Sequence, residues 1–255
     1  MESVPILDPN TIPLLVPRPP APPTPIVSSN TSSSSSLGMF DLVLRGQEQL
    51  TEVLRDERTL PVATQRLLLL SLLGLGVHGL VVGFAAEVLD RGGLGDGGIM
   101  QQGHPMLWMP IAFVLAFLGA LAVCLPSFYF YTQLSGLDAS FRLVAAQALR
   151  AQATTSVLLL GAIPFYAAAV LSAAVGLVGN VPAVILIGLC LPFVVGLIGL
   201  RALYRAFRDL AKVLPITHVR RGNFLARMVL CWGAIYTAVA PVALYRLAEV
   251  LGQRI

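Results

Sequence analysis

The chain has 255 residues, of which 56% are hydrophobic and only 12% are charged, whereas an average soluble domain carries about 25% charged residues. Together with a mean hydropathy of +0.80, this composition excludes an ordinary soluble domain and predicts an all-α polytopic membrane protein. The net charge of +4 indicates no particular partner, because the placement of charge matters more than its sum in a membrane protein. No nucleic-acid partner is expected.

The cysteines and the basic residues indicate which chemistry and which membrane to expect. Cys124, Cys190 and Cys231 are odd in number, lie in apolar stretches and form no C-x-x-C pair, so neither a disulfide framework nor a thiolate metal site is expected. Sixteen of the seventeen basic residues are Arg, which is typical of a high-GC bacterial genome. We therefore expect a multi-pass protein of the bacterial inner membrane, whose first span acts as its own insertion signal.

The first 60 residues differ from the rest of the chain. Residues 1–38 contain "VPRPPAPPTP" and "SSNTSSSSS" and predict a disordered, Pro/Ser-rich cytoplasmic tail, which serves either as a tether or as a polyproline ligand. Residues 39–60 alternate apolar and charged positions near helical spacing. This pattern predicts an amphipathic helix that lies on the bilayer or packs against the protein, and residues 1–60 are the candidate contact for a protein partner.

Five apolar stretches follow, each near the roughly 20 residues that a helix needs to cross the hydrocarbon. Within lipid the backbone satisfies its own hydrogen bonds only as a helix or a closed barrel, and runs of this length favour helices. Residues 61–255 are thus the predicted transmembrane domain, with spans at about 67–89, 107–131, 157–178, 183–203 and 224–248. Only a tight turn around Asn180 and Pro182 separates spans three and four, which predicts a helical hairpin.

The basic residues also predict the orientation of these spans. With the N-terminus in the cytoplasm, fourteen of the seventeen basic residues lie on the inner side, and only Arg91, Arg246 and Arg254 lie on the outer side. Because basic residues accumulate in cytoplasmic loops, we place the N-terminus inside and the C-terminus outside. Arg246 and Glu249 are three residues apart on the last span, a spacing that predicts an ion pair.

Two inner segments have helical patterns. "SGLDASFRLVAAQALRAQ" opens with a Ser135-x-x-Asp138 cap and is expected to run as a helix into the third span. "RALYRAFRDLAKVL" predicts a basic amphipathic helix, with Leu203, Phe207, Leu210 and Leu214 on one face and Arg201, Arg205, Arg208 and Lys212 on the other. The four basic residues either hold the loop inside or contact anionic lipid headgroups or a partner.

No motif indicates an enzyme. "GLGDGG" at residues 93–98 matches a dinucleotide fingerprint in letters only, because it follows a membrane span rather than a strand. No P-loop, zinc-protease, nucleophile-elbow or paired-carboxylate pattern occurs. No cofactor or metal is expected either, and a bis-histidine haem is disfavoured because His104 and His218 lie outside the spans.

One histidine lies near the middle of the first span, in "GLGVHGLVVG". His78 is about 18 Å along the helix from Arg66 at 1.5 Å per residue, close to the bilayer midplane. It shares a helix face with Ser71, and we expect it to face protein rather than lipid. His78 and Ser71 are the candidate intramembrane polar site. The imidazole serves either structure, through a bond to another span's backbone, or transport chemistry.

Small residues predict where helices approach closely. Gly76, Gly79 and Gly83 share one side of the first span, away from His78. Gly188, Gly196 and Gly199 lie along one side of the fourth span, at spacings that permit close contact with another helix of this chain or of a second subunit. Prolines 126, 164, 192 and 241 each remove a helix hydrogen bond within a span, a defect that neighbouring groups in a membrane protein repair.

The layout resembles that of bacterial Yip1-domain membrane proteins. Five spans, a Pro-rich cytoplasmic tail and an outside C-terminus are shared features. The segment "SGLDASFRLVAAQALRAQATTSVLLLGAIPFYAAAV" (135–170) is similar to the family's Gly, amphipathic stretch and span with an early Pro. The similarity covers roughly residues 107–245 and supplies no catalytic residues. A tyrosine-rich tail motif of the eukaryotic members is not found in this sequence.

Two functions are compatible with these features. The first is a non-enzymatic scaffold or accessory subunit, which engages a partner or anionic lipid on the cytoplasmic side through the tail and the basic helix. The second is a small transporter or channel subunit with a midplane cavity near His78, formed where Pro-containing spans meet.

Overall fold

The computed structural model describes residues 43, 54, 58–91, 104–134, 139–213 and 221–252. The chain divides into two units, Met1–Ser34 and Ser35–Ile255, and all described residues belong to the second. The predicted tail at 1–38, most of the 39–60 segment, the Ser135/Asp138 cap, Leu214 and the side chains of Leu210 and Lys212 lie outside the described residues.

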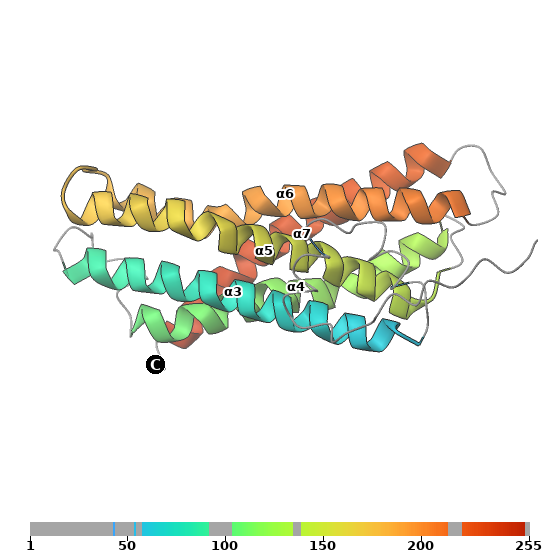
Figure 1. Cartoon of the computed structure of the whole chain (residues 1–255), viewed down its shortest axis with the longest axis horizontal. Helices are drawn as coiled ribbons and strands as arrows, with labels where there is room; N and C mark the ends of the chain where they lie inside the picture. Colours follow the sequence, from blue (N-terminus) through green and yellow to red (C-terminus); the bar gives the residue numbers. More distant parts are fainter. Residues whose placement is uncertain are drawn as a thin grey trace, which may run out of the picture. The chain divides into compact units, whose positions relative to one another are not determined.

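Five long helices make up the described part of the chain, which contains no strand (Figure 1). Each is long and apolar enough to cross a membrane, which confirms the predicted all-α class and the predicted number of membrane-length helices. The helices have 30 to 34 residues, or about 45–50 Å at 1.5 Å per residue, so they exceed the roughly 30 Å hydrocarbon. They are α3 (Leu60–Arg91), α4 (Pro105–Leu134), α5 (Phe141–Ala174), α6 (Val181–Val213) and α7 (Arg221–Gly252).

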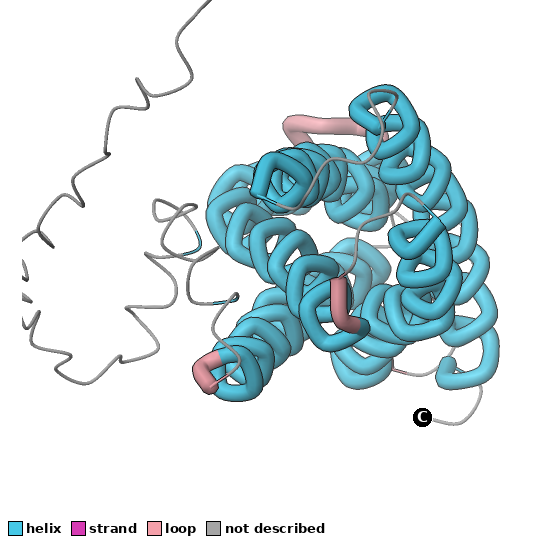
Figure 2. The backbone as a smooth tube through the Cα atoms, turned by 90° about the vertical axis from the view of Figure 1, so that its right-hand side faces the viewer, coloured by secondary structure: helices cyan, strands magenta, loops and turns pink. Residues whose placement is uncertain are grey.

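The helices pack as a ring in which each contacts two main neighbours. The ring order is α3, α4, α7, α6, α5 and back to α3, with few contacts across it; Figure 2 views the helices along their length. Contacts between α6 and α7 are the sparsest of the ring. Because α4 packs on α7 rather than on α5, the ring brings together side chains that are more than 100 residues apart in sequence.

Helix α5 begins well before the predicted third span. It starts at Phe141 rather than near residue 157, and Ser140 caps it by accepting a hydrogen bond from the Leu143 N–H at 3.3 Å. The predicted helical segment and the third span are one continuous helix, as expected. Residues 144–157 are buried except for 145 and 149, which are partly exposed, so the polar groups in this part of α5 face protein instead of water.

Arg150 illustrates how α5 keeps a charge inside the bundle. Only 6% of this residue is exposed, and the charge of Asp209 on α6 acts on it. A buried charge is tolerated when an opposite charge compensates its desolvation. The polar first half of α5 is therefore held by α6, whose own end carries the acidic residue.

The hairpin between α5 and α6 is confirmed. Gly176 takes a positive φ of 78° in the turn, a conformation that residues with a Cβ rarely adopt. Asn180 then starts α6, because its side-chain oxygen accepts a hydrogen bond from the Ala183 N–H at 3.2 Å. Pro182 occupies the first turn of α6, where its missing N–H costs no helix bond.

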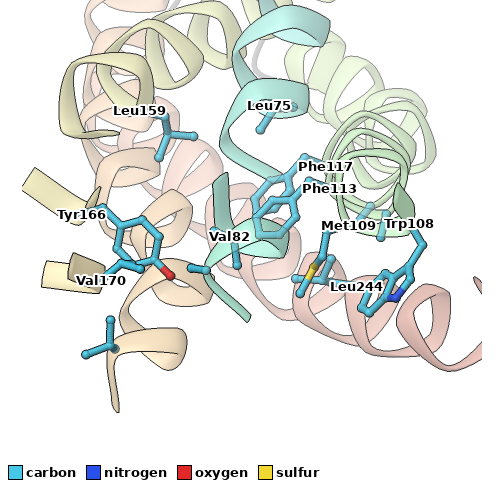
Figure 3. Packing of buried hydrophobic residues seen from close by; sticks show 14 of the residues in the cluster. Leu75, Val82, Trp108, Met109, Phe113, Phe117, Leu159, Tyr166, Val170 and Leu244 are labelled. Atoms are coloured by element: carbon cyan, nitrogen blue, oxygen red, sulfur yellow. The ribbon is translucent and has the colours of Figure 1, made fainter. Parts of the chain in front are cut away.

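Buried side chains form the interior, and large apolar side chains also cover the outside. Figure 3 shows the largest cluster, in which Trp108, Phe113 and Phe117 of α4 meet residues of the other helices. Outside the ring, Val123 is 73% exposed and Phe165 is 81% exposed. Such an apolar exterior is unfavourable in water and suits lipid. Val43 and Leu54, from the predicted 39–60 helix, are buried beside the start of α3.

Candidate functional site

His78 is fully buried in α3 and bonds to the backbone of α6. Its Nε2 lies 3.0 Å from the Gly188 carbonyl oxygen, and the Phe113 ring meets the imidazole edge-on at 5.3 Å between centroids. A carbonyl only accepts a hydrogen bond, so Nε2 carries the hydrogen and Nδ1 is the free acceptor. The structure thus places His78 against another helix's backbone, one of the two roles expected from the sequence.

The partner of His78 is a carbonyl that α6 itself leaves unpaired. In a helix, the Gly188 oxygen accepts from the N–H of residue 192, and residue 192 is proline, which has none. His78 supplies the missing donor. The interaction therefore repairs the Pro192 defect with a side chain from a neighbouring span, as membrane helices require.

Gly188 and Tyr166 make this contact tight. A Cβ at Gly188 would collide with the Tyr166 ring, so glycine lets α5 and α6 approach here, as predicted for Gly188. The Tyr166 ring is 6.4 Å from that of His78. Within the described part of the chain, neither the Tyr166 hydroxyl nor His78 Nδ1 has a hydrogen-bond partner.

Ser71 does not join His78 in one site. Its hydroxyl donates to the Leu67 carbonyl at 2.9 Å, and its own carbonyl accepts from the Ser156 hydroxyl at 3.4 Å. Both residues are buried, but Ser71 belongs to the contact between α3 and α5. The predicted polar pair is therefore two separate structural interactions.

The glycines of α3 define its contact with α4. A Cβ would lie 2.8 Å from Pro110 Cα at Gly79 and 3.0 Å from Met106 Cα at Gly83, distances that leave no room for it. Gly76 is less constrained, because a Cβ there would meet only a Val114 methyl group at 3.9 Å. The predicted face of the first span is thus directed at α4.

Gly199 packs closely as predicted, Gly196 makes no close helix contact within the described part of the chain, and close packing at Gly74 was not predicted. Among the described residues, no atom lies within 4 Å of a Cβ built at Gly196, because this part of α6 borders a cavity. Close approach occurs instead at Gly74, where a Cβ would lie 2.6 Å from Ser156 Cβ, and at Gly199, where it would lie 2.8 Å from the Ala151 oxygen.

A cavity of about 50 Å³ lies between four of the helices. A volume of this order accommodates water or a small polar group. His78 is not among its lining residues, so this cavity differs from the one expected near His78. The lining combines polar and aromatic side chains of α4, α5, α6 and α7, among them Phe117, Gln152, Thr155, Pro192, Phe193, Leu197, Trp232, Tyr236 and Thr237.

Gln152 and Tyr236 give the cavity its polar character. The Tyr236 hydroxyl oxygen lies 3.0 Å from Gln152 Oε1 and 3.1 Å from the Phe117 carbonyl oxygen. One hydroxyl hydrogen is thus shared between two acceptors. The Gln152 Nε2 group has no hydrogen-bond partner among the described residues, although Gln152 is only 6% exposed. A residue of the cavity lining therefore carries a buried N–H donor that calls for an acceptor.

Trp232 completes the aromatic wall. Its ring stacks on Tyr236 at 5.5 Å between centroids, and its Nε1 donates to the Cys124 carbonyl at 3.3 Å. The sequence spacing could have predicted part of this wall. Trp232 and Tyr236 are four residues apart and Gln152 and Thr155 are three apart, so each pair shares a helix face.

The basic residues of α6 lie on its exposed side. Arg201, Arg205 and Arg208 are exposed, whereas Leu203 and Phe207 are buried against the other helices. The arginines continue α6 beyond its apolar part as one unbroken helix to Val213. Three cations are thus presented together at one end of the bundle.

Two further observations concern charge and metals. The predicted pair at the end of α7 is confirmed, with Arg246 Nη1 3.0 Å from Glu249 Oε2. Over the described ranges, no three His, Cys, Asp or Glu side chains lie close enough together to hold a metal ion.

Comparisons with known proteins add no assignment. No family model, no curated protein and no solved structure matches this chain. The resemblance to Yip1-domain proteins stays a prediction.

Proposed function

We propose that this protein is a non-enzymatic scaffold or accessory subunit of the bacterial inner membrane, and that it binds anionic lipid headgroups on the cytoplasmic side through the arginines of α6. The observation that carries the proposal is the exposure of Arg201, Arg205 and Arg208 where a membrane-length helix ends. Lys212 continues the same sequence pattern.

The proposed orientation agrees with this role. With the N-terminus in the cytoplasm, the end of α6 meets the inner leaflet, whose anionic lipids attract basic residues by about 1 kcal/mol each. Burial of Leu203 and Phe207 fixes which side of α6 faces outward. The three arginines are then held toward the lipid without further ordering of the backbone.

The experiment is a lipid titration of the full chain in detergent. Ligand that binds the folded state raises the unfolding temperature, so the rise at each concentration reports an apparent Kd. We expect phosphatidylglycerol, which is anionic, to bind more tightly than zwitterionic phosphatidylcholine. Replacing all three arginines with Gln removes about 3 kcal/mol of this preference, or roughly 150-fold.

The matched control replaces two exposed arginines on other helices, Arg142 of α5 and Arg227 of α7, with Gln. Because these two arginines lie on different helices, their loss should reduce the preference for phosphatidylglycerol much less than loss of the three grouped arginines of α6. Equal affinity of the wild-type protein for both lipids would contradict the proposal. Capture of a protein by residues 1–60 with no lipid preference would favour a scaffold that acts through its tail.

A transporter or channel subunit is the second candidate, and the polar cavity between α4, α5, α6 and α7 favours it. His78 has no direct place in this version, because it bonds to Gly188 and does not line the cavity. Solute flux in proteoliposomes that falls in a Gln152→Leu variant but survives His78→Ala would support it, and absence of flux would count against it.

A further inference from the structure

We propose that the cavity receives an ester carbonyl of an anionic phospholipid whose headgroup is held by Arg201 and Arg205. The inference rests on the proposed lipid binding and deepens it, because it assigns the buried Gln152 amide as the donor to the lipid's glycerol ester region. The occupant is thus one phospholipid molecule that contacts both the basic side of α6 and the cavity.

The cavity has a side that faces the lipid. Leu197 of α6 is 62% exposed and Thr237 of α7 is exposed, yet both line the cavity. They belong to the two neighbouring helices whose mutual contacts are the sparsest of the ring. A lipid in the bilayer therefore reaches the cavity between α6 and α7.

The cavity mouth and the arginines lie on one side of α6. At 100° per residue, Leu197, Arg201, Arg205 and Arg208 fall within about 80° of one another around the helix. A lipid aligned along α6 would contact the exposed arginines with its headgroup and Leu197 with the start of its chains. The charges and the cavity are therefore parts of one surface.

The depth of the Gln152 amide along the bundle matches that of a lipid ester carbonyl. Gly199 packs beside Ala151 and Thr155 of the antiparallel α5, which sets Arg201 level with Gln152. Arg205 lies about 6 Å farther toward the end of α6, at 1.5 Å per residue. A phospholipid carries its ester carbonyls below its phosphate, so a phosphate near Arg205 brings a carbonyl to the depth of Gln152.

The Gln152 amide gives the cavity a chemical preference. Its Nε2 is a donor without a partner among the described residues, and a buried unpaired donor is costly until an acceptor arrives. Phe117, Phe193 and Trp232 surround the remaining space with apolar surface. A single acceptor oxygen on an apolar chain fits this lining.

The test compares two phosphatidylglycerols that differ only in how their chains are linked. Ether-linked lipid lacks the carbonyl oxygen but keeps the headgroup charge. From the lipid titration of the full chain, we expect the ester-linked lipid to bind the wild-type protein about fivefold to tenfold more tightly, as for one hydrogen bond. Gln152→Leu should abolish this difference and leave the preference for phosphatidylglycerol over phosphatidylcholine.

Gln147→Leu is the matched control. Gln147 is also buried on α5, and its side-chain oxygen has no partner among the described residues. It does not line the cavity, so its variant should keep the ester preference. Equal affinity of the wild-type protein for both linkages overturns the inference and leaves water as the occupant. The proposed function fails separately, if phosphatidylglycerol and phosphatidylcholine bind alike.

Discussion

The hydrogen bond between His78 and Gly188 predicts that the effect of replacing His78 depends on Pro192. If His78 supplies the donor that Pro192 lacks, its value depends on the residue at position 192. In a Pro192→Ala background the helix regains an N–H at that position, and the Gly188 carbonyl is paired within α6. His78→Ala should then cost less than it does in the wild-type protein.

The expected coupling follows from the geometry. In the wild-type background, His78→Ala leaves the buried Gly188 carbonyl unpaired, a cost of about 1–3 kcal/mol. Interhelical hydrogen bonds in membranes average nearer 0.6 kcal/mol, with a maximum of about 1.7. The space left by the imidazole is the same in both backgrounds and cancels. We therefore expect a coupling energy of about 1 kcal/mol.

The assay is unfolding of the full chain in mixed micelles by titrated dodecyl sulfate, followed by far-UV circular dichroism for all four members of the cycle. His78→Leu, which fills more of the space than alanine but cannot donate, should show the same coupling as His78→Ala. Additivity of the two substitutions within about 0.5 kcal/mol would refute the reasoning, because the histidine would then stabilise the fold independently of Pro192.

The remaining predictions concern packing, the cavity and orientation. Gly79→Ala should cost about 1–3 kcal/mol, because its Cβ would lie 2.8 Å from Pro110 Cα; Gly161→Ala, with nothing within 4 Å, should be neutral or stabilising, and equal costs in the micelle assay would contradict this. Tyr236→Phe should cost about 0.5–1.5 kcal/mol by the same measurement, through loss of its hydrogen bonds; an unchanged stability would argue against them. Alkaline phosphatase fused after Ile255 should be active in cells, since we place the C-terminus outside; an inactive fusion with an active cytoplasmic reporter would reverse the orientation.

Hydropathy predicted the number of membrane-length helices but not which of their polar residues are buried. Apolar runs have few structures available in lipid, so the five spans follow from length and composition alone. The burial of the first half of α5 did not follow, because Gln147, Arg150 and Gln152 are polar residues of a helix predicted on the inner side of the membrane. They are buried only because the ring of helices surrounds this part of α5, and that arrangement is a property of the whole chain.

The polar sites show a similar division. A fixed local rule links Pro192 to the carbonyl of Gly188, so the need for a donor near residue 188 was predictable. That His78 would supply it was not, since the two residues are 110 positions apart. The cavity was even harder to predict from the sequence, because Gln152 and Tyr236 meet only through the order of helices in the ring.

Whether the exposed arginines of α6 hold anionic lipid is measured most directly by the phospholipid that stays bound to the purified protein. The full chain is reconstituted in vesicles of equal phosphatidylglycerol and phosphatidylcholine, extracted gently, and its retained phospholipid is quantified by mass spectrometry. We predict enrichment of phosphatidylglycerol with the wild-type protein and its loss when Arg201, Arg205 and Arg208 are replaced by Gln. Equal retention of the two lipids by the wild-type protein would contradict the account.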